Sequence, residues 1–144
     1  MAKSLTLALF LLANAAAASQ IVIAGRVISL SPDNLSQHEF QLSSEMLGNE
    51  LYVDISAPMS SHDRQLAHYS VGFRGGDYSV QVKPAAEQTR HPIQVGLTPC
   101  SLAGSQVTIT YTADGEKPVF FLIEFYEFQE FLDLPEGDVG CESP

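Results

Sequence analysis

The segment SSHDRQLAH contains side chains with the chemistry to bind a transition metal. His62, Asp63 and His68 lie within one stretch of seven residues. Imidazole nitrogens and carboxylate oxygens are common ligands of zinc and copper. The spacing matches neither HExxH nor CxxC, so the prediction of a metal site here depends on the fold bringing the three side chains together. Solvent-exposed loop histidines are the alternative interpretation.

A second group of oxygen ligands lies near the C-terminus. The sequence DLPEGD places Asp133, Glu136 and Asp138 close together around Gly137, in a region without basic residues. Hard oxygen ligands of this kind suit calcium, although the spacing is not that of the twelve-residue EF-hand loop. Three interpretations stay open: a calcium site, a solvated acidic face, and a docking surface for a basic partner.

The sequence shows no recognisable catalytic motif. A GxSxG elbow is absent, and Gly75 and Gly76 stand between two predicted strands instead of at the start of a helix, which a phosphate-binding loop would require. Acidic residues are numerous, but nothing selects one carboxylate pair for glycoside cleavage. We therefore predict a non-enzymatic protein, and a small hydrolase would require a cleft with convergent polar groups.

The N-terminal residues have the layout of a secretory signal peptide. Lys3 precedes an apolar run from Leu5 to Ala13, and small residues continue to Ala18. The run is too short and too rich in alanine for a membrane span. We expect cleavage after residue 18, one domain over residues 19–144, and a periplasmic or secreted location. In an oxidising compartment the two cysteines, Cys100 and Cys141, are expected to form a disulfide.

The charge of the chain limits its partners. Seven Lys and Arg residues stand against seventeen Asp and Glu residues, which gives a formal net charge of −10. Removal of the signal peptide takes away Lys3 and no acid, so the charge becomes −11. Nucleic-acid binding needs a basic footprint, which this composition disfavours. The excess of acid disfavours an anionic membrane surface and favours solubility, basic partners or cations.

The hydrophobic pattern has a period of two, which is typical of strands. QVTITYT alternates apolar residues with threonine, and two further alternating runs, Tyr69–Phe73 and Asp77–Val82, flank a glycine turn at residues 75–76. Other strands are expected within residues 21–30, 38–42, 50–56, 92–97 and 119–126. About eight short strands predict a single antiparallel β-sandwich with jelly-roll or Greek-key connections. A small, partly open β-barrel is the alternative.

The phenylalanine-rich segment from Pro118 to Asp138 has three interpretations. A membrane span is excluded because Glu124 interrupts the apolar run. An amphipathic helix would place Phe121, Phe125 and Phe128 on one face. The preceding Asp-Gly turn and the β-preferring residues favour a strand over residues 119–126, covered on both faces. Residues 127–134 are then expected to form a short helical turn or an irregular extension.

These observations lead to two functional hypotheses. The first is an exported, non-enzymatic domain that binds a protein partner or assembles with itself at the envelope or cell surface. Such a domain would dock through an uncovered strand edge or through an apolar patch at Phe128 and Phe131. The alternative is a metal- or ligand-binding module that uses one of the two candidate metal sites. Among the tyrosines, we expect Tyr69, Tyr78 and Tyr111 in the core, whereas Tyr52 is expected on the surface.

Overall fold

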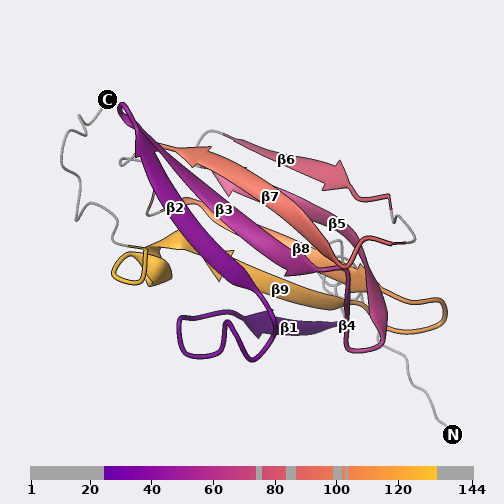
Figure 1. Ribbon diagram of the computed structural model, residues 1–144. Helices are drawn as coiled ribbons and strands as arrows, with labels where there is room; N and C mark the ends of the chain where they lie inside the picture. Colours follow the sequence, from indigo (N-terminus) through magenta and orange to yellow (C-terminus); the bar gives the residue numbers. More distant parts are fainter. Residues whose placement is uncertain (1–24, 74–75, 84–86, 99–101, 103, 133–144) are drawn as a thin grey trace, which may run out of the picture.

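The computed structural model of the chain describes residues 25–73, 76–83, 87–98, 102 and 104–132. These residues form an all-β fold of two packed sheets (Figure 1), which confirms the predicted fold class. The strands are β1 (Arg26–Ser29), β2 (Gln41–Leu47), β3 (Glu50–Pro58), β4 (Ser60–Ser61), β5 (Arg64–Phe73), β6 (Gly76–Gln81), β7 (Arg90–Leu97), β8 (Gln106–Thr112) and β9 (Val119–Glu124), followed by a 3-10 helix, η3 (Phe125–Phe128). No helix among the described residues is long and apolar enough to cross a membrane.

The larger sheet, called sheet A here, has the strand order β1-β9-β8-β5-β4, and β6 also pairs with β5. The smaller sheet, sheet B, has the order β2-β3-β7. Neighbouring strands are antiparallel except for β1 and β9, which run parallel. Parallel pairing joins the beginning of the described chain to its last strand, so residues far apart in sequence meet at one edge of sheet A.

The core lies between the two sheets because each central strand turns alternate side chains inward. In β8, Val107, Ile109 and Tyr111 are completely buried, as the alternation of QVTITYT predicts. Sheet B contributes buried residues such as Val53 and Val95. Burying one side chain of this size stabilises a fold by about 1.5–3 kcal/mol, so this layer supplies much of the driving force for folding.

The hairpins form where turn residues occur. Phe73 pairs with Gly76, which confirms the predicted β5–β6 hairpin. The β2–β3 turn lies at Gly48, whose φ of 67° favours glycine, and at Asn49. Residues 43–47, which lie between two predicted strands, extend β2. These residues lack β-branched side chains, but pairing with β3 makes them a strand.

Strand β5 begins at Arg64, five residues before the predicted start at Tyr69. The register shifts between Leu66 and His68, which marks a β-bulge. A bulge adds one residue to one strand, so the period of two is interrupted there. Residues 57–65, which lie between two predicted strands, form the end of β3 and the β4–β5 hairpin.

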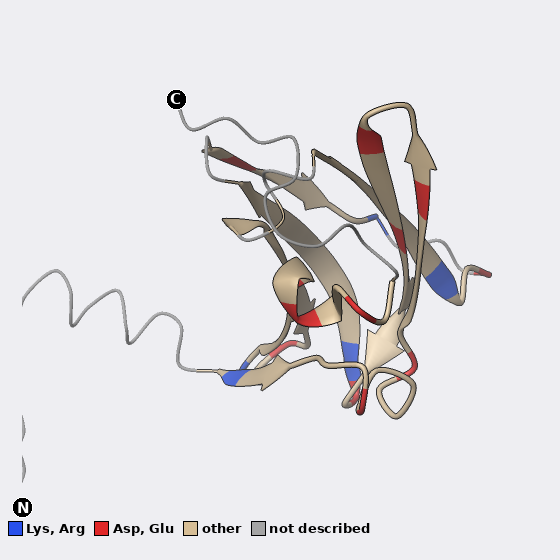
Figure 2. Ribbon diagram, turned by 90° about the vertical axis from the view of Figure 1, so that its left-hand side faces the viewer, with Lys and Arg blue, Asp and Glu red and all other residues tan. Residues whose placement is uncertain are grey.

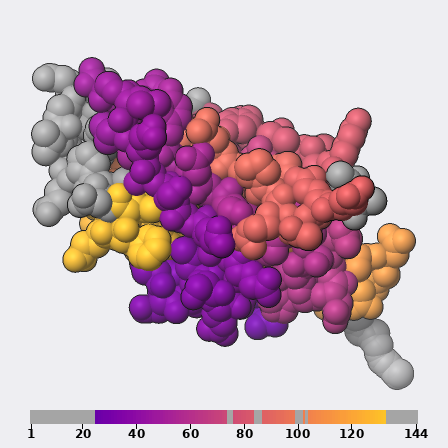
Figure 3. All heavy atoms as spheres, viewed as in Figure 1, coloured from indigo at the N-terminus to yellow at the C-terminus, as the bar shows by residue number. Residues whose placement is uncertain are grey.

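The phenylalanine-rich segment is a strand that ends in a helical turn. β9 stops at Glu124, two residues earlier than predicted, and η3 follows. The change of direction allows both Phe125 and Phe128 to be buried. Beyond η3 the Ser44 hydroxyl donates a hydrogen bond to the Leu132 carbonyl at 2.9 Å, and Figure 3 shows this yellow segment lying against the purple residues of β2. The outer face of β9 is only half-buried, which corrects the expectation of a strand covered on both faces.

Candidate functional site

The structure separates the three residues of the predicted transition-metal site. His62 and Asp63 form the β4–β5 turn with positive φ angles of 53° and 61°. His68 pairs with Thr110 in sheet A and alternates with the inward-facing Tyr69. The His62 ring instead lies 5.8 Å from the core residue Phe121. Within the part of the chain that the structure describes, no three His, Cys, Asp or Glu side chains are grouped to hold a metal.

His62 has a partner that the sequence did not indicate. The His38 ring stacks on the His62 ring with centroids 5.9 Å apart and an interplanar angle of 27°, and both rings contact Phe121. Burial, His62 and Arg26 together lower the pKa of His38. The two histidines are 24 positions apart (62 against 38), so no local motif connects them.

A surface pocket of about 490 Å³ adjoins His62. We call it the basic pocket because its charged lining residues are Arg26, Arg64 and Lys117. His62 and the segments at Gly25 and Pro118–Val119 complete the lining. Acidic residues outnumber basic ones along the ribbon in Figure 2, so the grouping of three cations contrasts with the composition of the chain.

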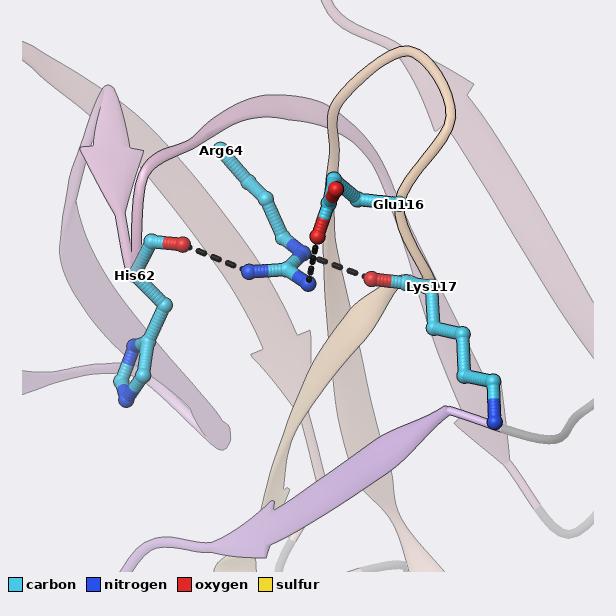
Figure 4. Close-up of polar contacts among 4 residues, drawn as sticks. All are labelled: His62, Arg64, Glu116 and Lys117. Carbon is cyan, nitrogen blue, oxygen red and sulfur yellow. Dashed lines mark hydrogen bonds and ion pairs between the residues drawn. The ribbon is translucent and has the colours of Figure 1, made fainter.

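Arg64 is held in the basic pocket mainly by backbone carbonyls (Figure 4). Its Nε donates to the Lys117 carbonyl and its Nη1 to the His62 carbonyl, both at 2.6 Å. Its Nη2 lies 3.6 Å from Oε1 of Glu116, whose side chain is 63% exposed. The guanidinium thereby ties the β4–β5 turn to the β8–β9 loop, and among the described residues the exposed Glu116 is the one carboxylate that pairs with it.

The parallel pairing of β1 and β9 brings Arg26 beside the segment that follows Lys117, so both cations line the basic pocket with Arg64. Arg26 stands opposite Val119, and its N–H donates to the Pro118 carbonyl at 3.1 Å. At Gly25 a Cβ atom would approach the Pro118 carbonyl oxygen to 2.4 Å, closer than Cβ atoms come in real structures. The approach of the two segments therefore requires glycine at this position.

A smaller groove of about 230 Å³ also adjoins His62. Its lining includes His38, Glu39 and Ser61, and the Ser61 hydroxyl lies 2.9 Å from Nδ1 of His62. The Arg90 guanidinium donates to the Glu39 carbonyl at 2.5 Å, which fixes the strained backbone of Glu39, with its φ of 66°. His62 is the residue common to this groove and the basic pocket.

At the far edge of sheet A, β6 pairs only with β5 among the described strands. The Val82 N–H donates to the Ala67 carbonyl at 2.9 Å, and hydrogen-bonded pairs alternate along an antiparallel ladder. Counting back along the register, Asp77, Ser79 and Gln81 direct their N–H and C=O groups away from β5. These groups form the free edge of β6.

Tyr78 lies on β6 between these outward-directed residues. It is 43% exposed, although the sequence predicts it in the core, and its ring centroid is 5.9 Å from that of Phe73. Strand β6 lies at an edge of sheet A with β5 as its only described neighbour, so an inward-facing position here does not become a buried one. The β5–β6 hairpin therefore presents both unpaired backbone groups and an accessible aromatic pair.

The structure divides the predicted apolar patch. Phe128 is fully buried, whereas Phe131 is 49% exposed, with ring centroids 6.1 Å apart. Only Phe131 can therefore contribute to a docking surface. Tyr52 is half-buried and packs on Gly96, where a Cβ would come 3.3 Å from its ring. A hydrogen bond to Glu50 and the charge of this carboxylate raise the pKa of the Tyr52 hydroxyl.

The remaining candidates lie outside the described residues. These are the cysteine pair Cys100 and Cys141 and the predicted calcium ligands Asp133, Glu136 and Asp138. The disulfide and the calcium site stay predictions from the sequence. Comparison of the chain with protein-family models, with curated proteins and with solved structures gave no match.

Proposed function

We propose that this protein is an exported, non-enzymatic interaction domain that captures an extended segment of a partner protein at the free edge of β6. The observation that carries the proposal is the row of outward-directed backbone groups at Asp77, Ser79 and Gln81. Edge strands that are not meant to pair are usually protected by proline, by charged side chains (lysine above all) or by a bulge. Over its six residues β6 has no proline, no lysine and no bulge, and Asp77 is its one charged residue.

The side chains of β6 indicate the chemistry of the partner segment. An added strand would place alternate residues beside Tyr78 and Val80 on the inner face and beside Asp77 on the outer face. The net charge of −10 favours a basic partner. The expected segment is extended and alternates apolar residues with Lys or Arg. Main-chain hydrogen bonds would supply affinity and the side chains would supply selectivity.

Ser79→Pro tests the proposal at the centre of the free edge. Proline removes an N–H that points away from β5, so the hairpin itself should persist. Peptides would be selected from a display library on the unsubstituted protein, and their affinities compared on Ser79→Pro and on the control Ser79→Ala. We expect the selected peptides to alternate apolar and basic residues. They should bind Ser79→Ala with unchanged affinity and Ser79→Pro at least about tenfold more weakly.

Amide hydrogen exchange on the peptide complex locates the contact independently. Strand addition should slow exchange at Asp77, Ser79 and Gln81 and leave the amides already bonded to β5 nearly unchanged. Full binding to the proline variant, or protection confined to another surface, would contradict the proposal. If a second copy of the chain occupies the free edge of β6, the unsubstituted protein should form a concentration-dependent dimer, and the Ser79→Pro variant should be monomeric.

The basic pocket favours a second candidate function, that of a ligand-binding module. This candidate differs from the metal-binding hypothesis in the charge of the ligand. The ligand would be an anion, because three cationic side chains repel a metal ion. This candidate uses a different region of the molecule from β6, and one protein can have both activities.

A further inference from the structure

We propose that the basic pocket binds a doubly charged tetrahedral oxyanion, that is, a phosphate or sulfate group. The first support is the distribution of charge. Three of the five Lys and Arg side chains in the described residues line this pocket, and no acidic residue lines it. In a chain with ten more acidic than basic residues, cations would be expected beside carboxylates, but the one ion pair that these three cations make among the described residues is that of Arg64 with Glu116, at 3.6 Å. Their mutual repulsion is relieved when an anion binds.

The second support is the state of the Arg64 guanidinium. Its side chain is only 17% exposed, and the two backbone carbonyls fix its orientation without neutralising its charge. A guanidinium has five N–H donors in a planar fork. Three are accounted for by Lys117, His62 and Glu116, which leaves two for a ligand. The pre-organised fork suits the oxygens of a tetrahedral anion.

The third support is that the basic pocket combines one side chain of fixed orientation with two side chains that are free to move. Arg26 and Lys117 are exposed, so their long side chains can close on a ligand beside the fixed Arg64. Three positive charges match a dianion better than a singly charged carboxylate. A volume of about 490 Å³ exceeds that of a single phosphate or sulfate ion, so the pocket has room for a larger molecule that carries the group.

The test is a titration of the isotope-labelled full chain followed by NMR, with inorganic phosphate, sulfate or acetate added at constant ionic strength. We expect saturable shifts of the amides at Arg26, His62 and Lys117 with phosphate or sulfate, with a dissociation constant on the order of millimolar. Acetate should bind at least about fivefold more weakly. Saturation by phosphate alone identifies a phosphate site, and saturation by sulfate alone identifies a sulfate site; either result supports the proposal.

Exposed positions supply the variants, so folding is not at risk. Arg26→Gln and Lys117→Gln should each weaken phosphate or sulfate binding about fivefold or more. Lys83→Gln removes an exposed cation elsewhere and should leave the affinity unchanged. The proposal is overturned if no amide at the pocket shifts saturably, if acetate binds as tightly as the dianions, or if Lys83→Gln weakens binding as much as Lys117→Gln.

Discussion

Single side chains in this sandwich connect segments that the strand ladders leave separate. The Tyr111 hydroxyl, completely buried, donates a hydrogen bond to the Pro58 carbonyl at 2.7 Å and so joins β8 to the end of β3. Burial raises the pKa of Tyr111 far above its usual value, so the hydroxyl keeps its proton. The Arg64 guanidinium connects two turns in the same way.

Tyr111→Phe should lower the free energy of unfolding by about 1–3 kcal/mol, because the Pro58 carbonyl would stay buried without this donor. Urea unfolding measures the change. Tyr126→Phe is the matched control, since the Tyr126 side chain is 59% exposed, and it should change stability very little. Equal unfolding curves for the two variants would contradict the structural role of the Tyr111 hydroxyl.

The stability of the protein should fall when the pH is lowered through the range in which histidine titrates. Burial, His62 and Arg26 lower the pKa of His38, and burial lowers that of His91, from the ordinary value of 6.5. Below pH 6.5 the unfolded chain therefore binds more protons than the folded chain, which favours unfolding. The stabilising effect is complete above this pH and is lost as the pH falls through the folded-state pKa values.

Urea unfolding between about pH 7 and pH 5.5 measures this dependence. The curve of unfolding free energy against pH should be less steep for His38→Gln and for His91→Gln, and least steep for the double variant. An unchanged slope in the double variant would show that these two histidines are not responsible.

At the scale of elements, the direction of a backbone N–H in the β5–β6 ladder decides whether proline at that residue disrupts the hairpin. Ser79 and Val80 are neighbours in β6, but the alternation of pairs directs the N–H of Ser79 away from β5 and that of Val80 toward Tyr69. Proline is therefore compatible with one position and disruptive at the next.

Val80→Pro should destabilise the β5–β6 hairpin and speed amide exchange along β6, whereas Ser79→Pro should leave exchange in the rest of the hairpin unchanged. Exchange monitored by NMR on the two purified variants distinguishes these outcomes. If Ser79→Pro opened the hairpin as readily as Val80→Pro, the assignment of the free edge would be wrong.

The pairing of β1 at the edge of sheet A depends on the close approach of Gly25 to the Pro118 carbonyl. Gly25→Ala should displace the start of β1 from the Pro118 carbonyl and lower stability by about 1–3 kcal/mol, as overpacking does. Gly72→Ala is the control, because its Cβ would meet only the Gln106 side chain at 3.6 Å. Thermal unfolding of both variants is the measurement, and equal melting temperatures would contradict the predicted clash.

At the scale of the whole molecule, the exported location and the disulfide are linked predictions from the sequence. If Cys100 and Cys141 are joined, the bond closes a loop of roughly 40 residues and stabilises by about 4 kcal/mol in the chain-entropy model. The intact mass of the exported protein should be about 2 Da below that of the reduced chain because two thiol hydrogens are lost. Reduction should lower the melting temperature by several degrees, and two free thiols in the exported protein would contradict the prediction.

The local pattern of the sequence allowed much of the fold to be predicted, because alternation and turn chemistry act between near neighbours. The all-β class, the inward positions of β8 and the glycine turn before β6 follow from such patterns. The start of β5 was missed because a bulge changes the alternation. The exposure of Tyr78 was missed because it depends on the place of β6 at the edge of sheet A.

The candidate sites depend on contacts over long distances in sequence. The sequence by itself determined the all-β class, most of the strands, the acidic charge and the residues available for binding. Only the tertiary structure decided that His62 faces His38 instead of His68, that Phe128 is buried, and that Arg26 lines one pocket with Arg64 and Lys117. The physical reason is that one set of alternating strands is compatible with many strand orders, and the packing of both sheets selects which distant residues become neighbours.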